Sequence, residues 1–385
     1  MTHRAHCLAL SALMTFAGVA AAQTAPPPAD PAAFARCLDG IRGDAAKQGI
    51  PADAFARLTG DLQPDMSVLP LLDSQPEFTT PLWDYLAGLV DEQRVTDGRA
   101  MLAEHRDLLA RVSAQYGVDA ETVVAVWGVE SDFGRISGKR PLRVSLATLA
   151  CNGRRQAFFR SEFVALLKLL HAGDLRDPHT TGSWAGAFGH TQFMPSTYAR
   201  IAVDFDGDGK RDLWNSSADA LASAAHYLQA SGWQRGQPWG FEVRLPSDFD
   251  YALADPDQRR SLTEWAELGV RPLAPTGAAA SARASLQLPA GHKGPAFLLL
   301  DNFRSILKYN NSTSYALAIG LLADNLVRPS EVQGQWPRGE RQLGRSERVE
   351  LQELLAQAGF DPGPADGIIG ANTRKAIRAL QLQLN

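Results

Sequence analysis

The chain has 385 residues and a mass of 41.6 kDa, which is more than one typical domain needs, so we expect two or three domains. The formal net charge of −4 and the pI of about 6.1 argue against a nucleic-acid-binding protein that relies on a basic surface. After the N-terminal region, no stretch reaches about 18 uninterrupted apolar residues, so we expect no transmembrane segment.

Residues 1–22 have the features of a cleavable signal peptide. Arg4 gives a positive start, an apolar run of small residues follows, and Ala20, Ala21 and Ala22 fit the cleavage pattern. We therefore expect a soluble periplasmic protein whose mature chain starts near Gln23. A proline-rich spacer then extends to residue 33.

Export would remove Cys7 and leave two cysteines, Cys37 and Cys151. Two cysteines in an oxidising compartment can pair, so we predict a disulfide between them. The alternative is two separate buried thiols, because free cysteine is often buried.

Residues 34–328 are expected to form one mainly α-helical domain. Apolar residues recur at helical spacing over several ranges, namely 34–58, 80–109, 154–170, 195–200, 218–228, 297–307 and 314–326. Between residues 239 and 295 the pattern changes: 241–245 and 284–288 alternate like strands, with a short helix near 262–268. This predicts a small mixed α/β insertion. Residues 329–345 are rich in Pro, Gly and charge and are expected to be a linker to a small domain at 346–385.

The stretch 123–134, V-V-A-V-W-G-V-E-S-D-F-G, carries the first candidate catalytic residue. Val123, Trp127 and Glu130 share one face of a predicted helix that is apolar nearly all round, which indicates burial. Burial raises the pKa of a carboxyl group, as a general acid near neutral pH requires. Asp132 cannot face Glu130 across two helical positions. Taken alone, the stretch is more typical of a core helix that ends in a surface glutamate.

An acidic stretch, D-F-D-G-D-G-K-R-D-L-W-N, begins at Asp204 and resembles the first half of an EF-hand calcium loop. At the twelfth position Asn215 replaces the usual bidentate glutamate, and Asp219 could supply the missing carboxylate. The predicted calcium ligands are Asp204, Asp206, Asp208, the backbone carbonyl of Lys210, and Asp219. The alternative is a turn rich in Asp and Gly that binds no metal.

Two further stretches could contact a polar ligand. In 182–198, G-S-W-A-G-A-F-G-H-T-Q-F-M-P-S-T-Y, Ser183 and Gln192 offer hydrogen bonds and Trp184 offers a stacking surface. In the stretch K-Y-N-N-S-T-S-Y, Tyr309 and Asn310 could form hydrogen bonds with such a ligand. Either stretch could instead be an ordinary helix contact or helix start.

Together these motifs, in this order from about residue 34 to about residue 327, resemble the lytic murein transglycosylase B family. The segment from Leu351 to Gln381, with D-G-I-I-G-A-N-T-R, resembles the small helical peptidoglycan-binding domain. The resemblance implies a lysozyme-like helical catalytic domain and a small three-helix-type C-terminal domain.

The resemblance also implies a function. Family members cleave the MurNAc–GlcNAc β-1,4 bond of peptidoglycan without water and form a 1,6-anhydro ring on the muramic acid. It implies that Glu130 is the single acid/base and that a structural Ca²⁺ occupies the acidic loop. It places the cleft residues at Ser183, Gln192, Tyr227, Tyr309 and Asn310. The peptidoglycan glycan strands would be the partner. Two alternatives remain open: a hydrolytic muramidase, and a non-catalytic peptidoglycan-binding scaffold.

Overall fold

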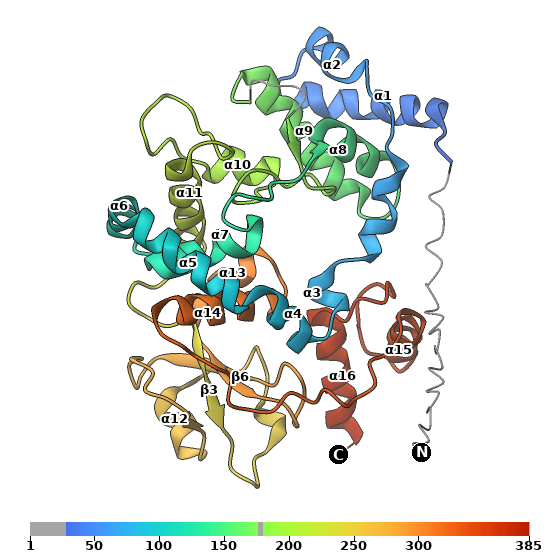
Figure 1. Ribbon diagram of the computed structural model, residues 1–385. Coiled ribbons are helices and arrows are strands. Elements are labelled where there is room, and N and C mark those ends of the chain that lie inside the picture. The colour runs from blue at the N-terminus through green and yellow to red at the C-terminus, as the bar shows by residue number, and fades with distance from the viewer. Residues whose placement is uncertain (1–27, 176–179, 385) are drawn as a thin grey trace, which may run out of the picture.

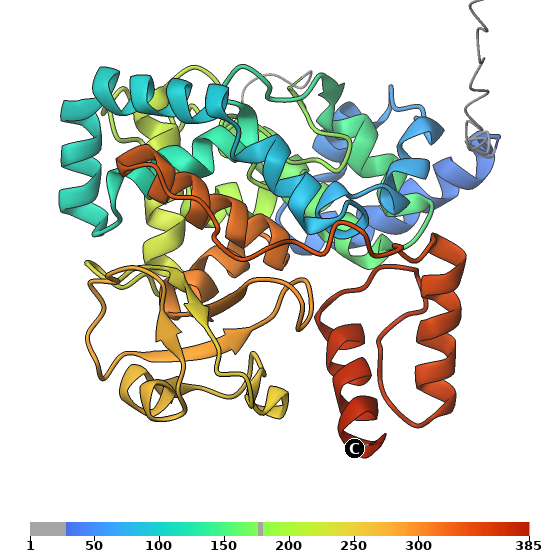
Figure 2. The same ribbon diagram turned by 60° about the horizontal axis from the view of Figure 1, so that its bottom comes forward.

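The computed structural model describes residues 28–175 and 180–384 (Figure 1). The predicted signal peptide and residues 23–27 of the spacer lie outside the described residues. A helical body carries a small antiparallel sheet domain and a C-terminal helical domain, which lie side by side on the same side of the body (Figure 2). Among the described residues, no helix is both long enough and apolar enough to cross a membrane.

The body is built from α-helices and two short 3-10 helices. Its elements are α1 (Pro31–Lys47), α2 (Ala52–Thr59), η1 (Met66–Val68), η2 (Pro70–Asp73), α3 (Pro76–Thr79), α4 (Leu82–Leu89), α5 (Glu92–Glu104), α6 (Arg106–Tyr116), α7 (Ala120–Ser131), α8 (Leu142–Cys151), α9 (Gln156–Ala172), α10 (Pro195–Ile201), α11 (Ser217–Ala230), α13 (Asp301–Tyr309) and α14 (Thr313–Val327). A two-residue ladder pairs β1 (Arg140–Pro141) with β2 (Thr181–Gly182).

Two of the predicted helical ranges are divided. Residues 34–58 form two helices, because Gly49 turns the chain at φ +83° and Pro51 precedes the second helix. Residues 80–109 divide among α4, α5 and α6. The side chain of Asp91 caps α5 by accepting a hydrogen bond from the backbone N–H of Arg94.

The body contains two hydrophobic cores. One lies among α1, α2, α8, α9 and α10, around buried residues such as Ile41, Phe163 and Leu166. The other lies among α4, α6, α7, α11, α13 and α14, with α7 packed on α14. Residues 122–128 of α7 are buried without interruption, as the all-round apolar pattern predicts. Cys37 and Cys151 form a disulfide that joins α1 to the end of α8.

The insertion is an antiparallel sheet with the strand order β4-β6-β7-β3-β5. Its elements are β3 (Gly240–Arg244), β4 (Arg260–Ser261), α12 (Leu262–Glu267), β5 (Arg271–Pro272), β6 (Arg283–Gln287) and β7 (Ala296–Leu299), with a 3-10 helix η3 (Tyr251–Leu253). The expectation of a helix over 297–307 is wrong at its start, because 296–299 is the strand β7. Phe297 packs in the core of the body and Leu298 in the core of the insertion, so β7 is buried on both faces and lacks the alternation of a half-exposed strand.

The C-terminal domain has two helices within the described residues, α15 (Arg345–Gln357) and α16 (Ala371–Leu384), where three were expected. The buried side chain of Gln352 joins its parts: its amide donates to the Thr373 hydroxyl at 3.1 Å, and its carbonyl accepts from the N–H of Gly367 at 2.8 Å.

The linker is attached both to the insertion and to the body. Its Gln333 and Gly334 N–H groups donate to the Glu242 carboxylate at 2.7 and 2.6 Å, and Lys293 pairs with Glu340 at 2.9 Å. Val332 and Trp336 pack against the core around α7 and α14. The linker is therefore a fixed part of the structure.

Candidate active site

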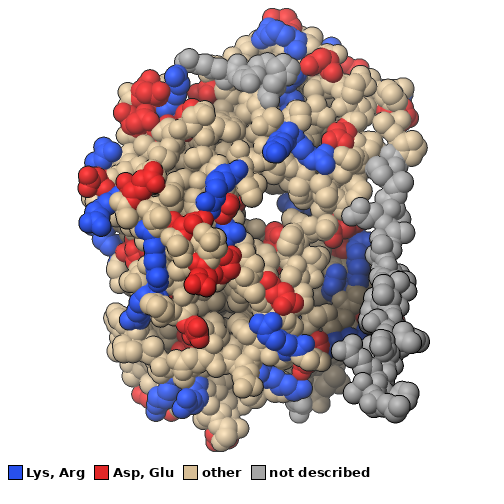
Figure 3. Space-filling model, viewed as in Figure 1, with Lys and Arg blue, Asp and Glu red and all other residues tan. Residues whose placement is uncertain are grey.

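A cavity of about 290 Å³ lies between the two helical cores. In the view of Figure 1, the space-filling picture in Figure 3 shows an opening near the middle of the molecule, between α7 and the segment that leads to α3. The cavity brings together side chains from five separate parts of the chain. Its lining residues are Ser74, Gln75, Pro76, Glu77, Glu130, Trp184, Ala185, Ala187, Gln192, Phe193, Met194, Thr197, Tyr227, Tyr309 and Asn310.

Glu130 reaches this cavity because α7 ends directly after it. The chain leaves the helix through two consecutive residues in the left-handed region, Asp132 at φ 51° and Phe133 at φ 57°. The Ser131 hydroxyl donates to the carbonyl of His190 at 2.7 Å and accepts from the N–H of Gly134 at 3.0 Å. These bonds fix the end of α7 against the loop that lines the opposite side of the cavity.

The Glu130 carboxyl is held in a state suited to acid chemistry. Burial raises its pKa to about 8, the nearby negative charge of Glu77 acts in the same direction, and a hydrogen bond from Tyr315 opposes them. The Tyr315 hydroxyl donates to Oε1 of Glu130 at 2.5 Å. Burial also raises the pKa of Tyr309 and Tyr315 well above the usual tyrosine value, so both phenols stay protonated beside Glu130.

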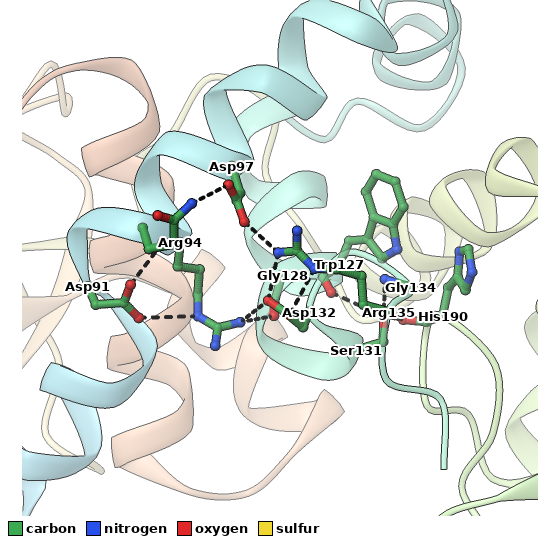
Figure 4. A network of polar contacts seen from close by, with 11 residues as sticks. Asp91, Arg94, Asp97, Trp127, Gly128, Ser131, Asp132, Gly134, Arg135 and His190 are labelled. Carbon is green, nitrogen blue, oxygen red and sulfur yellow. Dashed lines mark hydrogen bonds and ion pairs between the residues drawn. The ribbon is translucent and has the colours of Figure 1, made fainter. Parts of the chain in front are cut away.

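Asp132 follows the end of α7, lies outside the cavity lining and forms ion pairs. Its carboxylate pairs with Arg94 at 3.2 Å and with Arg135 at 2.9 Å (Figure 4). Arg94 also donates to the carbonyl of Gly128 in the last turn of α7, where a cation is favourable. This network of Arg94, Asp132 and Arg135 holds the helix that presents Glu130.

Four of the five predicted cleft residues line the cavity: Gln192, Tyr227, Tyr309 and Asn310. The Gln192 amide donates to the carbonyls of Gly189 and Ser137 at 2.8 and 3.2 Å. Ser183 is outside the lining set. Its hydroxyl accepts from the N–H of Ala187, a lining residue, at 3.0 Å, so Ser183 shapes the loop next to the cavity.

Aromatic rings form one side of the cavity. The rings of Tyr227 and Tyr309 are 4.6 Å apart, and Phe193 lies 5.8 Å from each. The Tyr309 hydroxyl donates to the carbonyl of Thr191 at 2.7 Å. These bonds and packing contacts fix the rings before any ligand arrives.

Tyr315 and Glu77 also lie at the site, although no sequence motif predicted a role for either. Tyr315 ends the K-Y-N-N-S-T-S-Y stretch, so the stretch was found but this residue was not assigned a role. Glu77 lies in α3, in a proline-broken region without periodicity. Its carboxylate accepts from the Asn310 amide at 3.3 Å, and its backbone carbonyl accepts from the Ser312 hydroxyl at 3.2 Å. The cavity thus contains two carboxyl groups, those of Glu77 and Glu130.

The acidic loop lies before α11, away from the cavity lining. Oxygen atoms of Asp204, Asp206 and Asp219 lie within 4.8 Å of one another. The Asp208 carboxylate lies outside this group and pairs with the side chain of Lys210 at 3.4 Å. Gly209 takes φ +84°, and its N–H donates to Asp204 at 2.8 Å, as the sharp turn of a calcium loop requires.

The fully buried Asp219 carboxylate accepts hydrogen bonds from the N–H groups of Phe205 and Asp212 at 2.7 and 2.8 Å. Burial raises the pKa of Asp219, and a bound cation would lower it again. Hard oxygen ligands converging around a buried carboxylate fit a calcium ion.

Comparison with known proteins identifies the family of the chain. The family model described as "Transglycosylase SLT domain" matches residues 33–324. The chain belongs to this family. A second model, described as "Putative peptidoglycan binding domain", matches residues 344–385 of the same transglycosylase.

Relatives of the transglycosylase support the same assignment. It is 34% identical over 274 residues to membrane-bound lytic murein transglycosylase B of Escherichia coli, covering 69% of this chain and 72% of that one. Its structure is similar to SltB3 of Pseudomonas aeruginosa in complex with NAG-anhNAM-pentapeptide, with 53% identity, coverage of 91% and 94%, and a TM-score of 0.83. It is also similar to E. coli SLT35 in complex with calcium, with 31% identity, coverage of 77% and 92%, and a TM-score of 0.65.

The transglycosylase is therefore a lytic enzyme of peptidoglycan with a lysozyme-like helical catalytic domain and a C-terminal peptidoglycan-binding domain. The alternative of a non-catalytic scaffold is set aside.

Proposed function

We propose that this enzyme cleaves the β-1,4 bond between MurNAc and GlcNAc and closes a 1,6-anhydro ring on the muramic acid, with Glu130 as both acid and base. The observation that carries the proposal is the partly buried Glu130 carboxyl, which lines the cavity and whose pKa is raised to about 8. SltB3 of P. aeruginosa has been solved with NAG-NAM-pentapeptide and with NAG-anhNAM-pentapeptide, which supports the same substrate class here.

In the first step, protonated Glu130 donates its proton to the glycosidic oxygen, and the bond from C1 of MurNAc to that oxygen breaks. The acetamido oxygen of the same sugar stabilises the positive charge that develops at C1, as in other substrate-assisted glycosidases. The Tyr315 hydroxyl then holds the Glu130 carboxylate through its hydrogen bond.

In the second step, the Glu130 carboxylate takes the proton from the C6 hydroxyl of MurNAc, and O6 forms a bond to C1. Glu130 returns to its protonated state, and no water is consumed. The aromatic side formed by Phe193, Tyr227 and Tyr309 offers stacking surfaces for sugar rings.

Glu77 gives the hydrolytic alternative a structural basis, because a muramidase needs a second carboxylate to activate water. Mass spectrometry of products from purified sacculi separates the two reactions. We expect muropeptides with 1,6-anhydro ends, which are lighter than hydrolysis products by one molecule of water. Products with reducing MurNAc ends would assign the enzyme to the hydrolytic class.

We also propose that the enzyme is exported to the periplasm through the predicted signal peptide, where its C-terminal domain binds the glycan strands of the cell wall. The disulfide between Cys37 and Cys151 supports export, because such bonds persist in oxidising compartments.

The acidic loop is proposed to hold a structural Ca²⁺ through Asp204, Asp206 and Asp219, with Asp208 and the Lys210 carbonyl as the further expected ligands. The ion would stabilise the loop that leads into α11, the helix that carries Tyr227 to the cavity. The calcium complex of SLT35 supports this proposal.

Calcium is expected to raise the melting temperature, because a ligand that binds only the native state stabilises it. At about 30 times its dissociation constant the ion would add about 2 kcal/mol, which corresponds to roughly 3 °C for a domain of this size. Differential scanning fluorimetry in CaCl₂ and in EDTA measures the shift. Asp204→Asn should abolish it, and the exposed control Glu353→Gln should keep it. Identical melting in both buffers would contradict the site.

A further inference from the structure

The C-terminal domain contacts the body next to the cavity. Residues 74–77, which we call the rim segment, all line the cavity and directly follow η2. In both ribbon views the C-terminal domain lies beside the part of the chain that carries this segment (Figures 1 and 2).

Alternating charges connect the two parts. Asp73, the residue before the rim segment, pairs with Arg345 of α15 at 3.1 Å and with Arg154 of the body at 3.4 Å. Arg154 in turn pairs with Asp366 of the C-terminal domain at 3.6 Å. We call these four residues the charge chain. The two outer residues of the charge chain, Arg345 and Asp366, therefore belong to the C-terminal domain. The two inner residues, Asp73 and Arg154, belong to the body.

Arg154 is itself held firmly. It lies in the short loop between α8 and α9, three residues after Cys151, which the disulfide joins to α1. Its guanidinium also donates to the backbone carbonyl of Leu72, the residue before Asp73. Arg154 thus ties the backbone before the rim segment to the core around α8 and α9.

The position of the rim segment matters to the reacting groups. Glu77 accepts hydrogen bonds from Asn310 and Ser312, on the opposite side of the cavity. Its charge also acts on Glu130 in the direction that keeps the acid protonated. An outward movement of the rim segment would weaken both effects and widen the cavity.

Three residues of the charge chain are more shielded than an ordinary surface pair. The side chains of Asp73, Arg154 and Asp366 are 39%, 30% and 24% exposed, and that of Arg345 is 55% exposed. A second ion pair between the domains, Lys375 with Asp257, is 76% and 69% exposed and joins α16 to the insertion. That pair supplies a control, because it also joins the C-terminal domain to the rest of the protein but does not contact the rim segment.

We propose that Asp73 is a positioning residue and that the C-terminal domain, through the charge chain, holds the rim segment in the geometry that binds the glycan. The domain then helps to form the catalytic cleft, in addition to binding the cell wall. This inference goes beyond the proposed reaction and does not depend on which residue is the acid. Fixing a binding surface in advance improves affinity by reducing the ordering cost of binding.

A double-mutant cycle in the full chain tests the proposal. Asp73→Asn and Arg345→Gln are each expected to raise the KM for soluble, peptide-free glycan strands about fivefold, with kcat changed less than about twofold. The double variant should also show about a fivefold increase, because both changes break the same contact. Lys375→Gln should leave KM unchanged. Melting temperatures and cosedimentation with sacculi should match the wild type in all variants.

An increase of about 25-fold in the KM of the double variant would overturn the proposal. So would an equal increase in the KM of Lys375→Gln, or an unchanged KM in both single variants. The pH profile gives a second readout. If the rim segment moves outward in Asp73→Asn, Glu130 loses the influence of Glu77, and the alkaline limb of kcat/KM should move to lower pH. This readout rests on the proposed role of Glu130, whereas the KM cycle does not, so the two proposals can fail separately.

Discussion

Glu130→Gln is expected to reduce the release of anhydro-muropeptides by about a thousandfold or more, because the amide can neither donate nor take up the proton that both steps transfer. The substitution preserves the size of the side chain and the hydrogen bond from Tyr315, so the fold should be maintained. Liquid chromatography of products from sacculi measures the loss. Cosedimentation with sacculi should be unchanged, because the C-terminal domain is intact. Turnover close to the wild-type rate would remove Glu130 from the mechanism.

The pH dependence gives an independent check on the same residue. The acid form of Glu130 is needed first, so the activity of the wild type should fall as pH rises through the pKa of about 8. Tyr315→Phe is the matched variant, because it removes the hydrogen bond that lowers this pKa and leaves the ring in place. Its alkaline limb should move to higher pH. A limb that moves to lower pH, or not at all, would contradict the role of this hydrogen bond.

Removal of the disulfide is expected to have the largest effect on stability. The bond closes a loop with a sequence separation of 114 residues, and constraints on long loops restrict the unfolded chain strongly. We expect the free energy of unfolding of the Cys37→Ala, Cys151→Ala double variant to fall by about 4 kcal/mol, which lowers the melting temperature by roughly 6 °C. Thermal unfolding monitored by circular dichroism measures the change.

Chemical reduction supplies the control for this prediction. A thiol reductant should lower the melting temperature of the wild type by a similar amount and leave that of the double variant unchanged. Equal melting of oxidised wild type and double variant would show that the disulfide contributes nothing to the stability of the native state.

The sequence predicted the helix that carries Glu130, because a strong local signal describes it. The residues of α7 are apolar on all sides, and a glycine-containing segment follows directly. The insertion was also predicted from a change in local composition. The strand β7 was not, because a short apolar run that is buried on both faces has no period that separates strand from helix.

The surroundings of Glu130 could not be predicted in the same way. Tyr315 and Glu77 lie 185 and 53 positions away in the chain, and only the packing of α14 and α3 brings them to the cavity. Spacing along one helix predicts which side chains share a face, but contacts between distant segments depend on the whole fold. In the acidic loop the structure brings together three of the predicted ligands, Asp204, Asp206 and Asp219, and leaves the Asp208 carboxylate outside that group.

The attached linker has a consequence for how the enzyme meets its polymer. A loose tether would let the C-terminal domain sample many distances, and the effective concentration of the bound glycan at the cleft would depend on tether length. Here Glu242 and Lys293 fasten the linker to the insertion, and Trp336 packs against the core of the body. The two glycan-binding sites therefore keep a constant spacing. Avidity is gained only where glycan strands lie at the spacing that lets them occupy the cleft and the C-terminal domain at once. The architecture of the wall would therefore select where the enzyme is retained.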